Sequence, residues 1–232
     1  MDKKISVLLS VYNGEYYLPT ALNSICNQTY ENFEFLIMDD CSDDNSYEIL
    51  KEFQKTDTRI RLFKNKNNLG LTKSLNILIS ESTGAYFARQ DVDDISLVQR
   101  FEKQMDLLIN ENYEVCTTRA IIREDTRITP NKSFYLPKYF VMNLKNPFVH
   151  GSLMITKKAL TNVGGYNEVF YYAQDYKLMS DLLAAGQKIK IIKDPYYILN
   201  IKDNISTNYK KQQQYYADCV RKKIQPEKLI KK

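Results

Sequence analysis

The feature that most constrains this fold is the alternation of short apolar runs with amphipathic stretches between residues 5 and 88. An uninterrupted apolar run is typical of a strand buried on both faces of a parallel sheet. Between the runs, apolar residues recur every three or four positions, as in helices that cover such a sheet. The predicted strands are 5–11, 33–38, 60–63 and 84–88, and the predicted helices between them are 15–27, 46–53 and 71–79. This order predicts an α/β fold with a mostly parallel, doubly wound sheet.

The second half of the chain continues the alternation with a weaker pattern. Ser96 is a suitable N-cap for a helix over 97–110. The stretch 123–145 has no clear period and is expected to be a loop region with short elements. A late strand is expected to stop at Asp194-Pro195, because proline interrupts the hydrogen bonding of a strand. The remaining predicted strands are 113–122, 152–155 and 189–192, and the remaining helices are 157–163 and 175–185.

Polar side chains follow three of the predicted strands at the point where each strand ends. Tyr12 follows the first strand, Asp40 the second, and the acidic stretch with Asp91, Asp93 and Asp94 the fourth. In sheets of this type, ligands bind outside the carboxyl ends of the strands. We therefore expect these side chains to open onto the same edge of the sheet.

The acidic stretch places three carboxylates within four positions, Asp91 to Asp94. Carboxylates crowded at the end of a buried strand repel one another unless a cation or polar partners offset their charge. A divalent cation with oxygen ligands is the simplest partner, and such ions commonly accompany a phosphate substrate. A solvated acidic turn is the alternative. The shared sheet edge favours the cation, with Asp94 in a structural role that caps or positions the following helix.

Composition narrows the class of protein. A chain of 232 residues without a linker-like segment is most simply one domain with a C-terminal extension. The net charge of +5 is too mild to indicate nucleic acid binding. No apolar run approaches the length of a membrane span. The cysteines are scattered, which favours free thiols in a reducing cytosol and hence a cytoplasmic location. They are Cys26, Cys41, Cys116 and Cys219.

Eight short segments of the sequence are informative together, because each is weak alone but their order and spacing along the chain form a pattern. They are SVLLSVYN (6–13), ICNQTY (25–30), MDDCSDDNS (38–46), NLGL (68–71), ARQDVDD (88–94), HGS (150–152), VGGY (163–166) and QDY (174–176). Together they resemble the family 2 glycosyltransferases of the Rossmann-like GT-A fold, over roughly residues 5–207. The resemblance implies a GT-A domain over 1–207, with a nucleotide-binding half (1–95) and an acceptor-binding half (96–207), followed by a basic helical tail (208–232).

The resemblance also implies how a nucleotide-sugar, with UDP as the expected nucleotide, would bind. Val11 and Tyr12 would line the nucleotide site. Asp40 would accept a hydrogen bond from the base, as an acceptor-only carboxylate can, or help to place the ribose. Asp91 would lie near the ribose or the metal. Lys73 would contact the base or the phosphates, although a solvated helix lysine is an equally good interpretation.

Catalytic roles follow from the same resemblance. Asp93, supported by Asp91, would bind Mn²⁺ or Mg²⁺, which neutralises the departing diphosphate. Asp175 would be the general base of an inverting transfer to a hydroxyl of a glycan or lipid-linked glycan. Such transfers build surface polysaccharide, lipopolysaccharide or glycoprotein glycans. By spacing alone, Asp175 is an ordinary aspartate near a helix N-terminus. His150 would contact the acceptor or the metal region, or have a structural role.

The chain departs from the family pattern at three positions. Gln174 replaces the glutamate that usually precedes the base, and Asp181 occupies a position where arginine is usual. Lys202 occupies a position where a late histidine is common, and its charge would replace that histidine as a phosphate contact. These changes motivate one alternative, a non-catalytic sugar-nucleotide binding protein. A nucleotidyltransferase is a second alternative. It is disfavoured because the loop 12–16 lacks the glycines and basic residues of a phosphate loop.

The tail from Lys210 to Lys232 is rich in lysine and arginine, with Tyr216, Val220 and Ile224 at helical spacing. A basic amphipathic helix can bind an anionic membrane surface, here as a peripheral contact on the inner face. The alternative is a solvated helix that packs its apolar stripe back on the domain.

Overall fold

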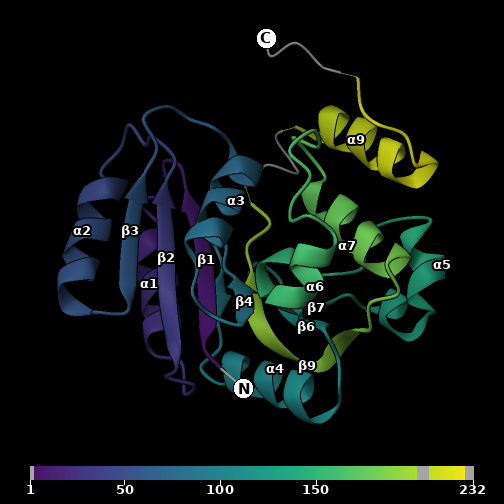
Figure 1. Ribbon diagram of the computed structural model, residues 1–232, viewed down its shortest axis with the longest axis horizontal. Helices are drawn as coiled ribbons and strands as arrows, with labels where there is room; N and C mark the ends of the chain where they lie inside the picture. The colour runs from purple at the N-terminus through teal and green to yellow at the C-terminus, as the bar shows by residue number, and fades with distance from the viewer. Residues whose placement is uncertain (1–2, 203–208, 228–232) are drawn as a thin grey trace.

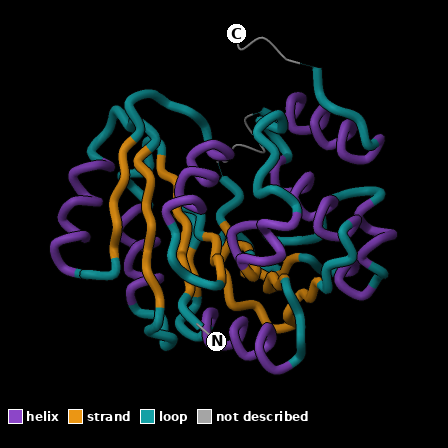
Figure 2. Tube along the Cα trace, in the orientation of Figure 1, coloured by secondary structure: helices purple, strands orange, loops and turns teal. Residues whose placement is uncertain are grey.

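The computed structural model describes residues 3–202 and 209–227. These residues form one nine-stranded sheet with helices on both faces, and its path runs β3-β2-β1-β4-β8-β6-β9-β5, with β7 paired to β6 (Figures 1 and 2). The predicted α/β architecture is therefore confirmed. Each of the four cysteines is a free thiol. Within the described ranges, no helix is long and apolar enough to span a bilayer.

The first half of the chain builds the parallel part of the sheet. Its strands are β1 (Ile5–Val11), β2 (Phe33–Asp39), β3 (Ile60–Lys64) and β4 (Tyr86–Arg89), and its helices are α1 (Leu18–Cys26), α2 (Ser46–Thr56) and α3 (Leu71–Glu81). Alternate residues of β1 face opposite sides. Leu8 packs with the core under α3, whereas Val7 and Leu9 pack with the core over α1. Burial on both faces explains why these strands read as continuous apolar runs.

The second half adds strands of mixed direction. Strand β8 runs antiparallel to both β4 and β6, and β9 runs parallel to β6. Helix α4 joins the core on the α1 side, while α6 and α7 join the core on the α3 side. The strands are β5 (Ile95–Ser96), β6 (Val115–Ile122), β7 (Ile128–Thr129), β8 (Met154–Thr156) and β9 (Ile189–Leu199). The helices are α4 (Arg100–Asn110), η1 (Lys132–Tyr135), α5 (Lys138–Met142), η2 (His150–Ser152), α6 (Lys157–Asn162) and α7 (Gln174–Ala184).

Two local predictions for this half are wrong. Ser96 does not cap a helix, because it lies in β5 opposite Tyr197 and its hydroxyl donates to Gln90 Oε1 at 2.6 Å. Helix α4 begins only at Arg100. Strand β9 does not stop at Asp194-Pro195, because Pro195 lies where the β6–β9 register shifts, at a bulge. A proline is tolerated there, since the ladder is already interrupted.

Helix α9 (Lys210–Lys222) lies in the predicted basic tail. Residues 208 and 228–232 of that tail lie outside the described residues. So do residues 203–207, at the end of the predicted GT-A domain. The apolar stripe of α9 is packed back on the protein: Tyr216 and Val220 are buried in the core on the α7 side. Ile224, beyond the helix, is exposed. The stripe that a membrane would contact is therefore occupied by the fold itself.

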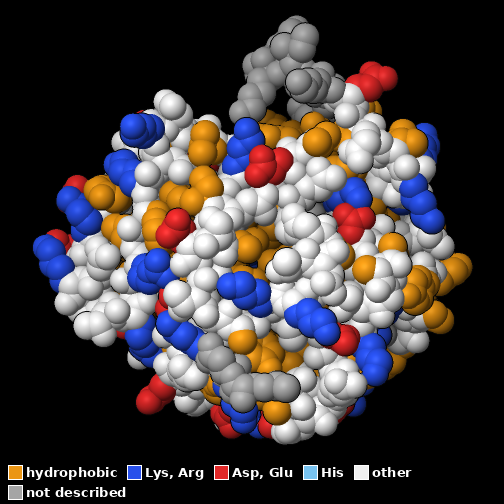
Figure 3. All heavy atoms as spheres, viewed as in Figure 1, with side chains coloured by type: hydrophobic (Ala, Val, Ile, Leu, Met, Phe, Trp, Pro, Cys, Tyr) orange, Lys and Arg blue, Asp and Glu red, His pale blue; other side chains and the backbone are white. Residues whose placement is uncertain are grey.

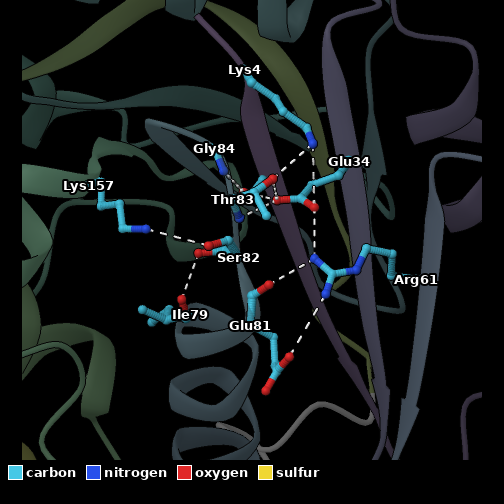
Figure 4. Close-up of polar contacts among 10 residues, drawn as sticks. Lys4, Glu34, Arg61, Ile79, Glu81, Ser82, Thr83, Gly84 and Lys157 are labelled. Carbon is cyan, nitrogen blue, oxygen red and sulfur yellow. Dashed lines mark hydrogen bonds and ion pairs between the residues drawn. The ribbon is translucent and has the colours of Figure 1, made fainter. Parts of the chain in front are cut away.

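A polar network around Glu34 ties together the amino ends of the central strands (Figure 4). The Glu34 carboxylate accepts hydrogen bonds from Ser6 Oγ at 2.7 Å, Thr83 N at 2.6 Å and Arg61 Nη1 at 2.9 Å. Lys4 Nζ lies 3.6 Å from it. A side chain on Gly84 would lie 2.6 Å from the Lys4 carbonyl oxygen, so glycine is required for this approach. The network joins β1, β2, β3 and the turn before β4, at the edge opposite the polar strand ends.

We expect Glu34→Gln to lower the free energy of unfolding at neutral pH by about 2 kcal/mol, because it weakens several hydrogen bonds to a charged acceptor. Burial raises the pKa of the Glu34 carboxyl, but hydrogen bonds from Thr83, Ser6 and Arg61 outweigh burial and lower the pKa to about 2. The contribution is therefore complete above the ordinary value of 4.5 and is lost as the pH falls toward 2. Urea unfolding of both proteins from pH 7 to pH 3 should show the difference shrinking.

The matched control is Glu48→Gln in α2, where the carboxylate is exposed and pairs only locally with Lys51. This change should alter stability by less than about 0.5 kcal/mol. Equal losses for the two variants would show that the network contributes nothing specific to stability.

Candidate functional site

The loops after β1 and β2 are joined by hydrogen bonds into one surface at the carboxyl end of the sheet. The Asp40 amide donates to the Val11 carbonyl at 2.8 Å. The Asn13 amide donates to Ser42 Oγ at 3.1 Å, and Asn13 Oδ1 accepts from the Asp43 amide at 2.8 Å. Next to this network of hydrogen bonds, the Tyr12 side chain is 48% exposed. Val11, the last residue of β1, is fully buried.

Asp40 is buried, and its carboxylate fixes the loop that precedes α3. Oδ1 accepts from Asn65 Nδ2 at 2.7 Å and from the Leu69 amide at 2.9 Å, and Oδ2 accepts from the Gly70 amide at 2.8 Å. A carboxylate has about four lone-pair sites, so these donors occupy most of its capacity. The contact of Asp40 with a base stays a prediction. Its loop-holding role was not visible in the sequence, because two of the three donors are backbone amides.

Asp39 directly precedes Asp40 at the same predicted strand end, but the sequence patterns assigned it no role. It is fully buried at the end of β2, and its Oδ1 accepts from the Ser42 amide at 3.2 Å. Its Oδ2 has no hydrogen-bond partner among the described residues, although Lys64 Nζ lies 3.5 Å away. Asp39 is thus a strand-end carboxylate with unused acceptor capacity.

Asp91 is held by groups from three parts of the chain. Its Oδ1 pairs with Nη2 of the buried Arg89 at 2.5 Å, and its amide donates to Tyr197 Oη at 3.2 Å. Gly151 packs against both: an added side chain would lie 2.8 Å from Asp91 Oδ2 and would clash with the Tyr197 hydroxyl. The glycine of the HGS segment is therefore required by the close approach of η2 to the acidic stretch.

Asp93 and Asp94 both accept hydrogen bonds from Asn200, which follows β9. Asn200 Nδ2 donates to Asp93 Oδ2 at 3.2 Å, and the Asn200 amide donates to Asp94 Oδ1 at 2.7 Å. Asp94 therefore has a structural role, as expected, but it holds the end of β9 and does not cap the following helix, whose N-cap is Gln99. Lys202, two residues after Asn200, is exposed, as is Lys73 on α3. The Lys202 amide donates to Asn200 Oδ1 at 3.2 Å, but no described contact joins either lysine side chain to the acidic stretch.

Arg89 offsets the charge of Asp91, but burial and crowding disfavour the charged forms of Asp93 and Asp94. Burial raises the pKa of Asp93, and the charge of Asp91 raises it further. Burial, followed by the charges of Asp91 and Asp93, raises the pKa of Asp94 well above its ordinary value. No group of three or more His, Cys, Asp or Glu ligands forms among residues 3–202 and 209–227. One or two carboxylates do fit Mn²⁺ or Mg²⁺ when substrate phosphates and water complete the coordination.

Asp175 lies in the first turn of α7, and Oδ2 accepts a hydrogen bond from Asn146 Nδ2 at 2.8 Å. The preceding Ala173 has a left-handed backbone (φ 51°), and its amide donates to Gln213 Oε1 of α9 at 3.1 Å. Gln174 Oε1 is buried without a hydrogen-bond partner in the described chain. Asn146 was not identified from the sequence, since it directly follows the stretch without a periodic pattern, where no motif marks it.

His150 directly precedes Gly151, which packs against Asp91. His150 Nε2 lies 2.7 Å from Tyr166 Oη. Burial lowers the pKa of His150, and the charge of Arg89 lowers it further, while the charges of Asp91 and Asp175 act in the opposite direction. The charges of Asp91 and Asp175, which are far apart in the chain, therefore both act on this imidazole.

Comparison with a protein-family model shows to which family the chain belongs. Residues 6–170 match the model described as glycosyl transferase family 2. The chain belongs to this family. Similarity to individual family 2 relatives extends across most of the chain. The glycosyltransferase MJ1057 of Methanocaldococcus jannaschii is 35% identical over 232 residues, covering 93% of this chain and 78% of the relative.

Two further relatives come from bacteria. EpsE of Bacillus subtilis is 36% identical over 173 residues, covering 72% of this chain and 61% of the relative. The Escherichia coli protein named UDP-Glc:alpha-D-GlcNAc-diphosphoundecaprenol beta-1,3-glucosyltransferase WfgD is 27% identical over 191 residues, covering 78% of this chain and 70% of the relative. The chain thus spans about three fifths of the length of EpsE.

Solved structures confirm the fold. TarS 1–349 of S. aureus superposes with a TM-score of 0.74 at 20% identity, covering 85% of this chain and 60% of that one. The mannosyltransferase PcManGT of Pyrobaculum calidifontis, solved with GDP-Man and Mn²⁺, gives 0.73 at 16% identity, covering 97% and 66%. The family 2 chain described here therefore has the predicted GT-A fold.

Proposed function

We propose that this chain is a metal-dependent, inverting glycosyltransferase that moves a sugar from a nucleotide-sugar to a hydroxyl of a glycan or lipid-linked glycan. The observation that carries this proposal is the packing of the acidic stretch: Val92 lies against Gly14 in the loop after β1, and Asp91 lies against Gly151, next to His150, whose imidazole also feels the charge of Asp175. A UDP-sugar is the favoured donor, because WfgD is named for UDP-Glc and a TarS structure contains UDP-GlcNAc. We place the reaction in the cytoplasm, as the free thiols favour.

The nucleotide would bind at the exposed edge of Tyr12 and over Val11. Asp40 has one acceptor site left after holding its loop, whereas Asp39 Oδ2 accepts no hydrogen bond from the described residues and has only the Lys64 ammonium nearby, at 3.5 Å. We therefore include Asp39 with Asp40 as a candidate acceptor for a base or ribose donor. Lys73 and Lys202, both exposed, are candidate contacts for the phosphates.

Asp93, with Asp91, would hold Mn²⁺ or Mg²⁺, which supplies Lewis-acid stabilisation of the leaving diphosphate. Asn146 fixes Asp175 through Oδ2, and we assign Oδ1 to accept the proton of the acceptor hydroxyl. The acceptor oxygen forms its bond to the anomeric carbon as the bond to the diphosphate breaks on the opposite face. The anomeric configuration is therefore inverted, and no covalent sugar–enzyme bond forms.

A non-catalytic sugar-nucleotide binding protein remains the second candidate, and Gln174 is the residue that favours it. A glutamine at this position cannot supply charge beside the base. Asp181 no longer supports this alternative, because it pairs with Lys177 one turn earlier in α7, at 2.5 Å. The change at Asp181 is thus accommodated on the helix surface.

Binding and turnover separate these candidates. UDP-, GDP-, CMP- and dTDP-sugars would be compared for thermal stabilisation with Mn²⁺, followed by an assay for nucleoside diphosphate release. The enzyme predicts stabilisation and release with the same donor. Stabilisation without release under any acceptor condition would support the non-catalytic alternative, and no stabilisation by any donor would contradict both.

We expect Asn200→Ala to weaken Mn²⁺ binding in the presence of UDP by about tenfold, because the side chain orients Asp93. The alanine backbone amide can still donate to Asp94, so the change tests the side chain alone. Calorimetric titration of Mn²⁺ measures the effect. Asn110→Ala in α4, where Asn110 bonds only Asp106, is the control. Equal Mn²⁺ affinity in both variants would remove Asn200 from the site.

A further inference from the structure

A patch of exposed apolar side chains lies on the segment 132–145, which contains η1 and α5. We call it the 132–145 patch. Figure 3 shows hydrophobic side chains gathered at the edge where α5 lies in Figure 1, with lysine and arginine side chains beside them. The exposed members are between 47% and 70% accessible: Tyr135, Leu136, Tyr139, Phe140 and Leu144. Large exposed apolar patches on folded proteins usually mark an interaction surface.

The 132–145 patch is held in place by the residues between its exposed members. Val141 and Met142 are buried, and the Tyr176 hydroxyl donates to the Met142 carbonyl. Phe134 packs against the core, with the Arg119 guanidinium 5.0 Å from its ring centroid. The backbone is thus anchored from both sides, so the exposed side chains are presented outward by the fold.

Within the patch segment itself, the charged side chains are all basic. The sequence contains no aspartate or glutamate from residue 126 to residue 167, whereas Lys132 and Lys145 are exposed within the patch. Arg221 of α9 donates to the Leu144 carbonyl at 3.1 Å, but its charge is already paired with Asp218, so among the described residues the unpaired positive charge of the patch comes from its lysines. Tyrosine, phenylalanine and leucine interleaved with lysine are the composition of surfaces that bind the interface of an anionic bilayer.

We propose that the 132–145 patch docks this protein on an anionic lipid bilayer. The apolar rings would enter the headgroup region, and the lysines would pair with anionic headgroups. This surface differs from the apolar stripe of α9, which is buried in the core. Asn146, the residue after the patch, holds Asp175. Resting on the proposed function, docking would bring the base close to acceptors at the membrane surface.

Vesicle flotation of the full chain tests the proposal. Vesicles of phosphatidylcholine alone would be compared with vesicles containing about a third phosphatidylglycerol. We expect binding to the anionic vesicles to be at least about tenfold stronger and to weaken with added salt. Tyr139→Ser combined with Phe140→Ser should reduce that binding by about tenfold or more, and Lys132→Gln combined with Lys145→Gln should do the same.

The matched control is Val98→Ser combined with Ile109→Ser, two exposed apolar residues outside the patch. It should bind vesicles as the parent does. Nucleoside diphosphate release without vesicles should be equal in all variants, so a docking failure is distinguishable from failure of the proposed function. Absent or charge-independent vesicle binding, equal loss in the control, or patch-dependent dimerisation in sedimentation velocity would each overturn the proposal.

Discussion

Asp175→Asn is expected to lower the rate of sugar transfer by about 10³-fold while nucleotide-sugar affinity changes by less than about twofold. Asparagine has nearly the same shape as aspartate but cannot accept the proton of the acceptor hydroxyl. The side chain lies in the first turn of α7 and contacts Asn146, outside the loops proposed to bind the nucleotide. Steady-state kinetics should therefore show a fall in kcat, and calorimetry should show unchanged donor binding.

Asp181→Asn is the control for this prediction, since Asp181 lies on the same helix and pairs with Lys177 at the surface. Its transfer rate should stay within about twofold of the parent rate. A normal rate for Asp175→Asn would refute the assignment of the base. A parallel loss of donor affinity would instead place Asp175 in the donor site.

Asp93→Asn is expected to weaken Mn²⁺ binding by at least about 10²-fold and to reduce transfer by a similar factor at limiting metal. The change removes a charge from a stretch where burial and the charge of Asp91 already raise the pKa of Asp93. The apoprotein should consequently be no less stable than the parent, because the substitution relieves repulsion. Metal titrations of nucleoside diphosphate release and thermal unfolding without metal give the two readouts.

An exposed aspartate provides the comparison for Asp93. Asp106 lies on α4 and accepts a hydrogen bond from Asn110, so Asp106→Asn should leave the metal dependence unchanged. Metal-independent transfer at the parent rate by Asp93→Asn would contradict the metal role. Partial recovery of Asp93→Asn at high Mn²⁺ would support it.

The parallel half of the fold could be predicted from the sequence because its strands are buried on both faces. Leu8 and its neighbours Val7 and Leu9 face different cores, so the run is apolar throughout. The second half of the fold was harder to predict, because strand pairing between distant residues overrides the local sequence preferences there. Ser96 has the chemistry of an N-cap, yet it pairs with Tyr197 in the sheet. Pro195 signals the end of a strand, yet a bulge accommodates it.

The candidate site could be predicted where it follows strand ends and could not where it depends on tertiary contacts. The strand-end rule points to Asp40 and Asp91 from the sequence alone. Asn200 and Tyr197 reach the acidic stretch from more than a hundred residues away. The local spacing of residues in the sequence does not indicate such long-range contacts. The 132–145 patch could not be predicted either, because the same residues could have been buried.

The most direct test of the central claim is the configuration of the first sugar released. With the UDP-α-sugar selected by the donor screen, Mn²⁺ and water as acceptor, time-resolved proton NMR can observe the product before it mutarotates. An inverting enzyme predicts that the β anomer appears first and that Asp175→Asn abolishes its formation. An α anomer as the first product, or undiminished β product from Asp175→Asn, would contradict the account.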